Sequence, residues 1–191
     1  MTVLTVGKAM GGDAAIKIKR FEATERTSRI LSAFHFFLYC EEVEYNTLMK
    51  AFSVSKKTAY RDINLLERAG VLEARFDQER KAFVTGKIGK LEMAAENNQT
   101  RLRYLRKIRR ICLWMLALED WEGSEDNLIA LYRRLFPEEK DRTRQRDFEE
   151  LRKLGYMLGY SSGDYFEPGG WYLEIPPAFG LKTIPNNVNW W

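Results

Sequence analysis

The chain has 191 residues, of which 45% are apolar and 30% are charged, and its formal net charge is +4. This length and balance fit one ordinary domain or two small ones, and they exclude a chain that is disordered throughout. The longest apolar run, Ile111–Leu118, is far shorter than the ~20 residues of a membrane-spanning helix. No secretory leader is recognisable, so we expect a cytoplasmic protein that makes no membrane contact.

The residues that carry most metal and nucleophile chemistry are scarce. The sequence has one histidine, His35, and two cysteines, Cys40 and Cys112. A zinc site needs three or four such ligands, and a Ser-His-Asp triad would require His35, which lies in an apolar helical stretch. We therefore expect no catalytic site, no metal and no cofactor, and we expect His35 to be packed in the core.

The first part of the chain has the pattern of three helices followed by a β-hairpin. Apolar residues recur at helical spacing, Ser55 is placed to cap the third helix, and Gly70 stands where a left-handed residue ends it. The predicted helices are residues 28–41, 45–52 and 56–69, and the predicted strands are 71–76 and 81–85. This order predicts a winged helix-turn-helix, with the turn at 77–80 as the tip of the wing.

The second part of the chain shows the same order of elements. A long helical stripe is followed by a short helix that ends at Pro137, and then by a third helix that ends at Gly155. The predicted helices are residues 100–118, 126–136 and 141–154, and the predicted strands are 156–160 and 171–175, joined by a longer loop. A second winged helix-turn-helix is therefore expected.

An internal repeat relates the two parts. Residues 58–70 and residues 143–155 align at a constant offset of 85 positions and share five identical residues. The identical pairs are Thr58 and Thr143, Arg61 and Arg146, Asp62 and Asp147, Leu66 and Leu151, and Gly70 and Gly155. Such a self-match predicts the same structural unit twice. The alternative is two amphipathic helices of similar composition.

We therefore predict a mainly α fold with small β-hairpins, of the α+β class, built from two tandem winged helix-turn-helix domains. The predicted regions are a variable N-terminal segment (1–24), a first domain (25–90), a long helix plus second domain (91–177) and a C-terminal tail (178–191). The tail ends in Trp190 and Trp191, whose apolar surface favours burial. It either folds back on the second domain or mediates a homodimer.

The third helix of the first domain resembles the recognition helix of DeoR-type and WYL-type bacterial transcription regulators. The residues that carry the resemblance are Val54, Ser55, Thr58, Arg61, Asp62, Leu66 and Gly70. The similarity covers about residues 26–85 and departs at Tyr60, where a second arginine is usual. The resemblance implies sequence-specific binding of double-stranded DNA.

The second domain resembles the further winged-helix segment that precedes the WYL domain in many of these regulators. The matching motifs are Arg146-Asp147, Glu150-Leu151-Arg152-Lys153-Leu154-Gly155 and Pro176-Pro177. The tripeptide Trp171-Tyr172-Leu173 falls in a predicted wing strand and is not the motif of the WYL domain itself. The resemblance carries no ligand sensing with it, and we identify no small-molecule effector.

The predicted DNA surface of the first domain begins on its third helix. Base edges in the major groove are reached by polar and basic side chains near the start of such a helix. The expected contacts are Ser55, Lys56, Lys57, Thr58, Tyr60, Arg61 and Asn64, and the wing adds Arg75, Arg80 and Lys81. The alternative for each charge is an ordinary solvated surface. Asp62 is expected to pair with a base of its own domain, because an acid facing DNA is unfavourable.

Two further basic groups complete the predicted surface. On the long helix, Arg103, Arg106, Lys107 and Arg110 fall on one side, opposite the apolar stripe, where they would follow the DNA backbone. The third helix of the second domain offers Arg142, Arg144, Gln145 and Arg146, but acidic residues surround them. This helix either contacts DNA or serves dimerisation or partner docking.

The pattern as a whole indicates a nucleoid-associated transcription regulator that binds double-stranded DNA through a winged helix-turn-helix, not an enzyme. Two alternatives belong to other functional classes. One is a DNA-binding or replication adaptor of a plasmid or another mobile element. The other is a winged-helix protein-interaction module that does not bind DNA.

Overall fold

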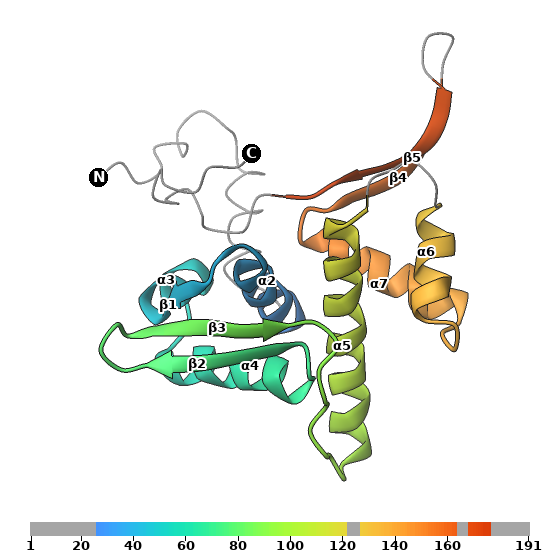
Figure 1. Ribbon diagram of the computed structural model, residues 1–191. Helices are drawn as coiled ribbons and strands as arrows, with labels where there is room; N and C mark the ends of the chain where they lie inside the picture. The colour runs from blue at the N-terminus through green and yellow to red at the C-terminus, as the bar shows by residue number, and fades with distance from the viewer. Residues whose placement is uncertain (1–25, 122–126, 164–167, 177–191) are drawn as a thin grey trace, which may run out of the picture.

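The computed structural model describes residues 26–121, 127–163 and 168–176 (Figure 1). This part of the chain contains six helices and two small antiparallel sheets, which confirms the predicted α+β class. None of the described helices is long and apolar enough to cross a membrane. The predicted N-terminal segment and the C-terminal tail lie outside the described residues, and so does the homodimer contact that we expect of the tail.

The first unit runs from α2 to β3. Its helices are α2 (Arg26–Tyr39), α3 (Tyr45–Phe52) and α4 (Lys56–Arg68), and its strands are β1 (Glu42–Glu44), β2 (Leu72–Asp77) and β3 (Ala82–Ile88). The three strands form an antiparallel sheet in the order β1-β3-β2. The helices lie within about two residues of their predicted bounds. Two details differ, because β3 extends beyond the predicted end at residue 85 and β1 was not predicted.

The second unit runs from α5 to β5. It consists of α5 (Gln99–Glu119), α6 (Leu128–Leu135), α7 (Asp141–Lys153), β4 (Met157–Gly163) and β5 (Pro168–Glu174). The two strands pair antiparallel, with Leu158 opposite Leu173. The second unit therefore follows the element order of the first, without a counterpart of β1 among the described residues.

The sequence repeat is also a repeat of local backbone geometry. The helices α4 and α7 are both 13 residues long. Gly70 and Gly155 follow these helices with φ angles of +64° and +97°, in the left-handed region that glycine adopts without strain. The residue after each glycine donates its N–H to the carbonyl of Leu66 or Leu151, at 3.2 and 3.1 Å. The same 85-residue offset therefore relates the ends and the following turns of both helices.

One continuous apolar core runs through both units. Phe34 of α2, Leu66 of α4 and Ile108 of α5 are fully buried in it, as are Trp114 of α5 and Leu151 of α7. Figure 1 shows α5 passing between the two groups of elements. The sequence predicts α5 as the opening helix of the second unit, and in the structure α5 also packs against α2 and α4 of the first.

Two neighbouring arginines on α5 bind opposite units. The guanidinium of Arg109 donates to backbone carbonyls at the end of α4 and after β3. The three acceptors are the oxygens of Ala69, Gly70 and Leu91, at 2.7, 2.9 and 2.7 Å. Arg110 instead donates through Nε to Asp147 of α7, at 2.5 Å. Hydrogen bonds from a charged donor are stronger than neutral ones, so α5 is anchored on both sides.

Candidate nucleic-acid interface

The outward face of α4 carries most of the predicted contacts in exposed positions. Lys56, Lys57, Arg61 and Asn64 are exposed, and Lys57, Arg61 and Asn64 are spaced so that they follow one side of the helix. No acid lies among the exposed residues of this helix. The face is therefore a basic and amide-bearing stripe that is free of competing carboxylates on α4 itself.

Ser55 fixes the start of this helix. Its Oγ accepts the N–H of Thr58 at 3.3 Å and lies 3.1 Å from the Thr58 hydroxyl. Such a cap satisfies one of the unpaired N–H groups of the first turn. Both side chains thus have a structural partner, and both lie at the end of the helix where its dipole is positive, which favours an anion.

Asp62 and Tyr60 lie on the inward face of α4, where both contact other elements of the first unit. Asp62 is buried and accepts from Arg29 Nε of α2 at 2.5 Å, so the prediction that this acid pairs with a base of its own unit is confirmed. Tyr60 is half-buried, and its ring lies 5.0 Å from those of both Phe76 and Phe83 on the hairpin. Its aromatic body therefore holds the helix against the β2–β3 hairpin.

An arginine groove lies beside the α4 stripe, between α4 and the first turns of α2 and α5. Its volume is about 440 Å³. Its lining residues are Arg26, Arg61, Asn64, Leu65, Arg68, Glu96, Arg101 and Leu105. The one acid, Glu96, accepts from Arg68 at 2.6 Å, and the pKa of its carboxyl is lowered by the backbone N–H of Asn98 and by Arg68. Four arginines against one ionised carboxylate leave the groove positive and suited to a phosphate.

Three of these arginines were not predicted as contacts. Arg26 begins α2, Arg68 ends α4 and Arg101 lies in the first turn of α5, so each comes from a different element. Arg26 is placed over the ring of Tyr104 on α5, at 5.5 Å from the ring centre. No local sequence pattern joins these residues, because only the packing of α5 on the first unit brings them together.

The basic side chains of the β2–β3 hairpin are exposed, and one of them, Arg80, forms an ion pair. Arg75 on β2 and Lys81 at the turn are both exposed. Arg80 donates to Glu42 of β1 at 2.8 Å, although 63% of its side chain stays accessible. A surface pair of this kind adds little stability and exchanges readily with a stronger anion.

The predicted basic face of α5 is divided in the structure. Arg103 and Arg106 are exposed. Lys107 donates to Glu150 at 3.1 Å, and Arg110 is largely buried between Asp147 and Glu139. The expectation of four residues on one open face fails because α7 packs against that side and supplies carboxylates.

Helix α7 presents a mixed surface. Arg142, Gln145 and Arg146 are exposed, as predicted for contacts. Arg144 is not, because its guanidinium lies 5.7 Å from the ring centre of Phe148 and only 13% of its side chain is accessible. Two ion pairs flank the exposed residues, namely Arg133 with Asp141 and Arg152 with Glu149. The positive potential is therefore weaker here than over α4.

No group of side chains in the described part of the chain has the composition of a metal site. Comparison of the sequence and structure with protein-family models, curated proteins and solved structures finds no match.

Proposed function

We propose that the protein is a sequence-specific, DNA-binding transcription regulator in which both units are winged helix-turn-helix domains and α4 is the recognition helix. The repeated order of three helices and a hairpin supports the domain assignment. The resemblance of residues 26–85 to the DeoR-type and WYL-type regulators supports the functional class. In this proposal the partner is double-stranded DNA, and the protein uses neither a metal nor a cofactor.

The observation that carries the proposal is the α4 stripe running into the arginine groove. Arg61 offers a bidentate donor pair that suits guanine, and Asn64 offers the donor and acceptor that suit adenine. Both also line the groove, whose other arginines suit the phosphates that flank a contacted base. Base readout and backbone positioning would thus occur side by side.

The second unit has a secondary role in this proposal. Arg142 and Arg146 occupy the positions of α7 that match Lys57 and Arg61 of α4 at the 85-residue offset. The ion pairs on α7 weaken the field around them, so α7 is expected to add non-specific backbone contacts at most.

The first test is selection of bound duplexes from random DNA by the full chain. We expect one enriched motif, bound more tightly than a scrambled duplex by at least three orders of magnitude, which is the usual lower range for specific readout. Two-fold symmetry in the motif would indicate the predicted homodimer. Recovery of no motif would contradict the proposed sequence-specific readout, and no binding to any duplex at low salt would contradict DNA binding altogether.

The second test uses the repeat as its own control. Lys57→Gln with Arg61→Gln and Arg142→Gln with Arg146→Gln remove the same charge from equivalent positions. We expect the first pair to lose preference for the selected motif and the second pair to keep it, as measured by fluorescence anisotropy. Equal losses in both variants would mean that binding depends on total charge and not on α4.

A further inference from the structure

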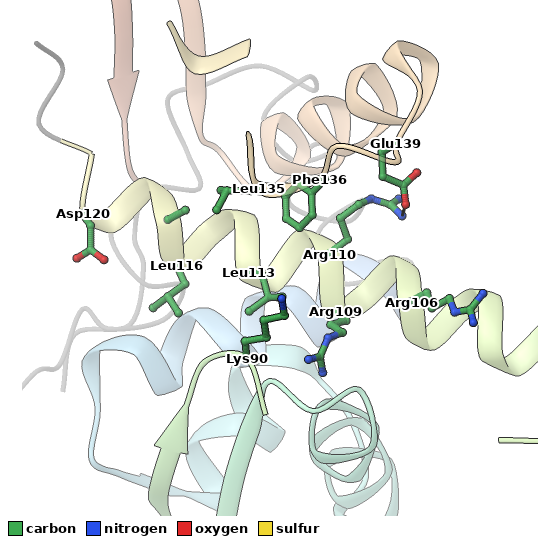
Figure 2. A pocket seen from close by; sticks show the side chains of 11 residues that line it. Lys90, Arg106, Arg109, Arg110, Leu113, Leu116, Asp120, Leu135, Phe136 and Glu139 are labelled. Atoms are coloured by element: carbon green, nitrogen blue, oxygen red, sulfur yellow. Dashed lines mark hydrogen bonds and ion pairs between the residues drawn. The ribbon is translucent and has the colours of Figure 1, made fainter. Parts of the chain in front are cut away.

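A second pocket lies along α5, with Leu135, Phe136 and Glu139 of the second unit on one side of the helix and Lys90 on the other (Figure 2). Its volume is about 510 Å³, within the range of small-molecule sites. The lining residues are Lys90, Arg106, Arg109, Arg110, Leu113, Leu116, Ala117, Asp120, Leu135, Phe136 and Glu139. Lys90 follows the first unit and Phe136 ends α6, so an occupant would touch parts of both units.

One part of the pocket is apolar. Leu113, Leu116 and Ala117 come from α5, and Leu135 and Phe136 come from the end of α6. Leu135 is 42% exposed, so its apolar surface is open to an occupant of the pocket. Covering this surface would release water and favour binding of an apolar body.

The other part is positive and incompletely neutralised. Lys90 and Arg106 are exposed, and neither forms an ion pair with another described residue. Arg109 donates to backbone carbonyls, which do not cancel its charge. Arg110 is the exception, because Asp147 and Glu139 already hold it.

The acids of the lining do not compensate these charges. Glu139 is bonded to Arg110, and Asp120 lies at the far end of α5 from Arg106, as Figure 2 shows. Lys90 lies beside Leu113, and Arg109 and Arg106 follow along α5, so these three cations border the pocket next to its leucines (Figure 2). A ligand that matches both has one anionic group and a compact apolar body.

We propose that this pocket binds a small amphipathic anion, that is, a carboxylate or sulfonate attached to an aromatic or alkyl body. Its anionic group would lie beside Lys90 and face the turn of α5 that carries Arg106 and Arg109, and its apolar body would cover Leu116 and Leu135. The pocket shares no lining residue with the arginine groove, and Arg106 and Arg110 are its two residues among the predicted DNA contacts.

The test is titration of the full chain with 1-anilinonaphthalene-8-sulfonate, whose fluorescence rises in apolar surroundings. We expect one saturable site per chain, with displacement by decanoate and much weaker displacement by decanol, which lacks the charge. Several weak sites, or equal displacement by the alcohol and the acid, would overturn the proposal.

Two matched pairs of variants locate the site. Lys90→Gln with Arg106→Gln is compared with Lys87→Gln and Arg103→Gln, which remove equal charge from exposed positions outside the pocket. We expect roughly tenfold weaker binding of the dye for the first pair and little change for the second. Equal weakening would mean that the dye responds to net charge, and would overturn the assignment.

The apolar floor has a control of its own. Leu135→Gln is compared with Met157→Gln, since Met157 is 52% exposed on β4 and lies outside the pocket. We expect only Leu135→Gln to reduce dye binding, with both variants keeping the circular dichroism spectrum of the parent. A loss confined to Met157→Gln would place the dye elsewhere and overturn the proposal.

Discussion

The helices α4 and α7 have matching positions in the two units. Each has a buried aspartate that is bonded to an arginine on the first helix of its unit, α2 or α5. They also share the glycine that ends them. They differ on the outside, where α4 bears no acid among its exposed residues and α7 bears acids that pair with its arginines. The repeat therefore preserves the framework, while the surface charge differs between the copies.

The shared aspartates give the largest expected effect. Asp147 accepts from Arg110 and also from the Tyr132 hydroxyl at 2.6 Å, whereas the side-chain bonds of Asp62 come from Arg29. Asp147→Ala would leave Arg110 partly uncompensated in the core and is expected to cost about 3–5 kcal/mol in the free energy of unfolding. Asp62→Ala should cost less. Urea unfolding of both variants measures the difference, and an equal or larger cost for Asp62→Ala would contradict it.

The contact between the units predicts a pH dependence of stability. His35 of α2 is buried, its ring lies 5.5 Å from that of Tyr156 in the second unit, and burial lowers its pKa from 6.5 to about 4. The unfolded chain binds this proton more readily, so stability falls as the pH drops from 6.5 towards 4. The loss reaches about 3 kcal/mol at full protonation.

The variant His35→Leu isolates this dependence. The carboxylates of the protein also titrate in this range, so the quantity to compare is the difference in slope between parent and variant. We expect the variant to show a smaller loss of unfolding free energy between pH 6.5 and 4. Parallel curves would mean that His35 is not held neutral in the folded state.

The capping glycines sharpen the comparison further. Both have positive φ, so alanine at either position is expected to cost about 1–3 kcal/mol. At Gly70 a methyl group would also collide with the Arg109 guanidinium and the Glu92 carbonyl, whereas at Gly155 it would meet only Pro176, at 3.3 Å. Gly70→Ala should therefore lower the melting temperature more than Gly155→Ala. A larger loss of melting temperature for Gly155→Ala would show that the Arg109 guanidinium moves aside from the new methyl group at little energetic cost.

The smallest expected effect concerns α5. Arg103→Gln with Arg106→Gln should flatten the slope of log affinity against log salt by about one unit for each DNA phosphate that these arginines neutralise. Lys107→Gln, at a position bonded to Glu150, should leave the slope unchanged. An unchanged slope in the double variant would place Arg103 and Arg106 away from DNA.

Local patterns in the sequence account for most of the fold. Apolar periodicity, the Ser55 cap and the two terminal glycines are signals within a few residues of one another, and they placed α2 to α7 close to their bounds. Strand β1 was not predicted because its alternation of exposed and buried residues spans only three residues, with Val43 as the one buried side chain, which is too short to stand out as a strand pattern. The pairing of Glu42 with Val84 on β3 depends on the tertiary fold.

The candidate site was only partly predictable for the same reason. Arg61 and Asn64 lie on one helix, so helical spacing was enough to place them together. The groove requires Arg26 and Arg101 to meet them, and that depends on how α5 packs. Helical spacing also identified the side of α5 that carries Arg110, but it did not reveal that α7 covers this side.

The adjacent anchors on α5 have a consequence for how the molecule comes apart. Arg109 is bonded to the end of the first unit and Arg110 to α7, one residue further along the same rigid helix. Loss of either unit would expose the α5 side chains that pack on it and free one guanidinium. The two units are therefore expected to melt together, as a single calorimetric transition whose van't Hoff and calorimetric enthalpies agree.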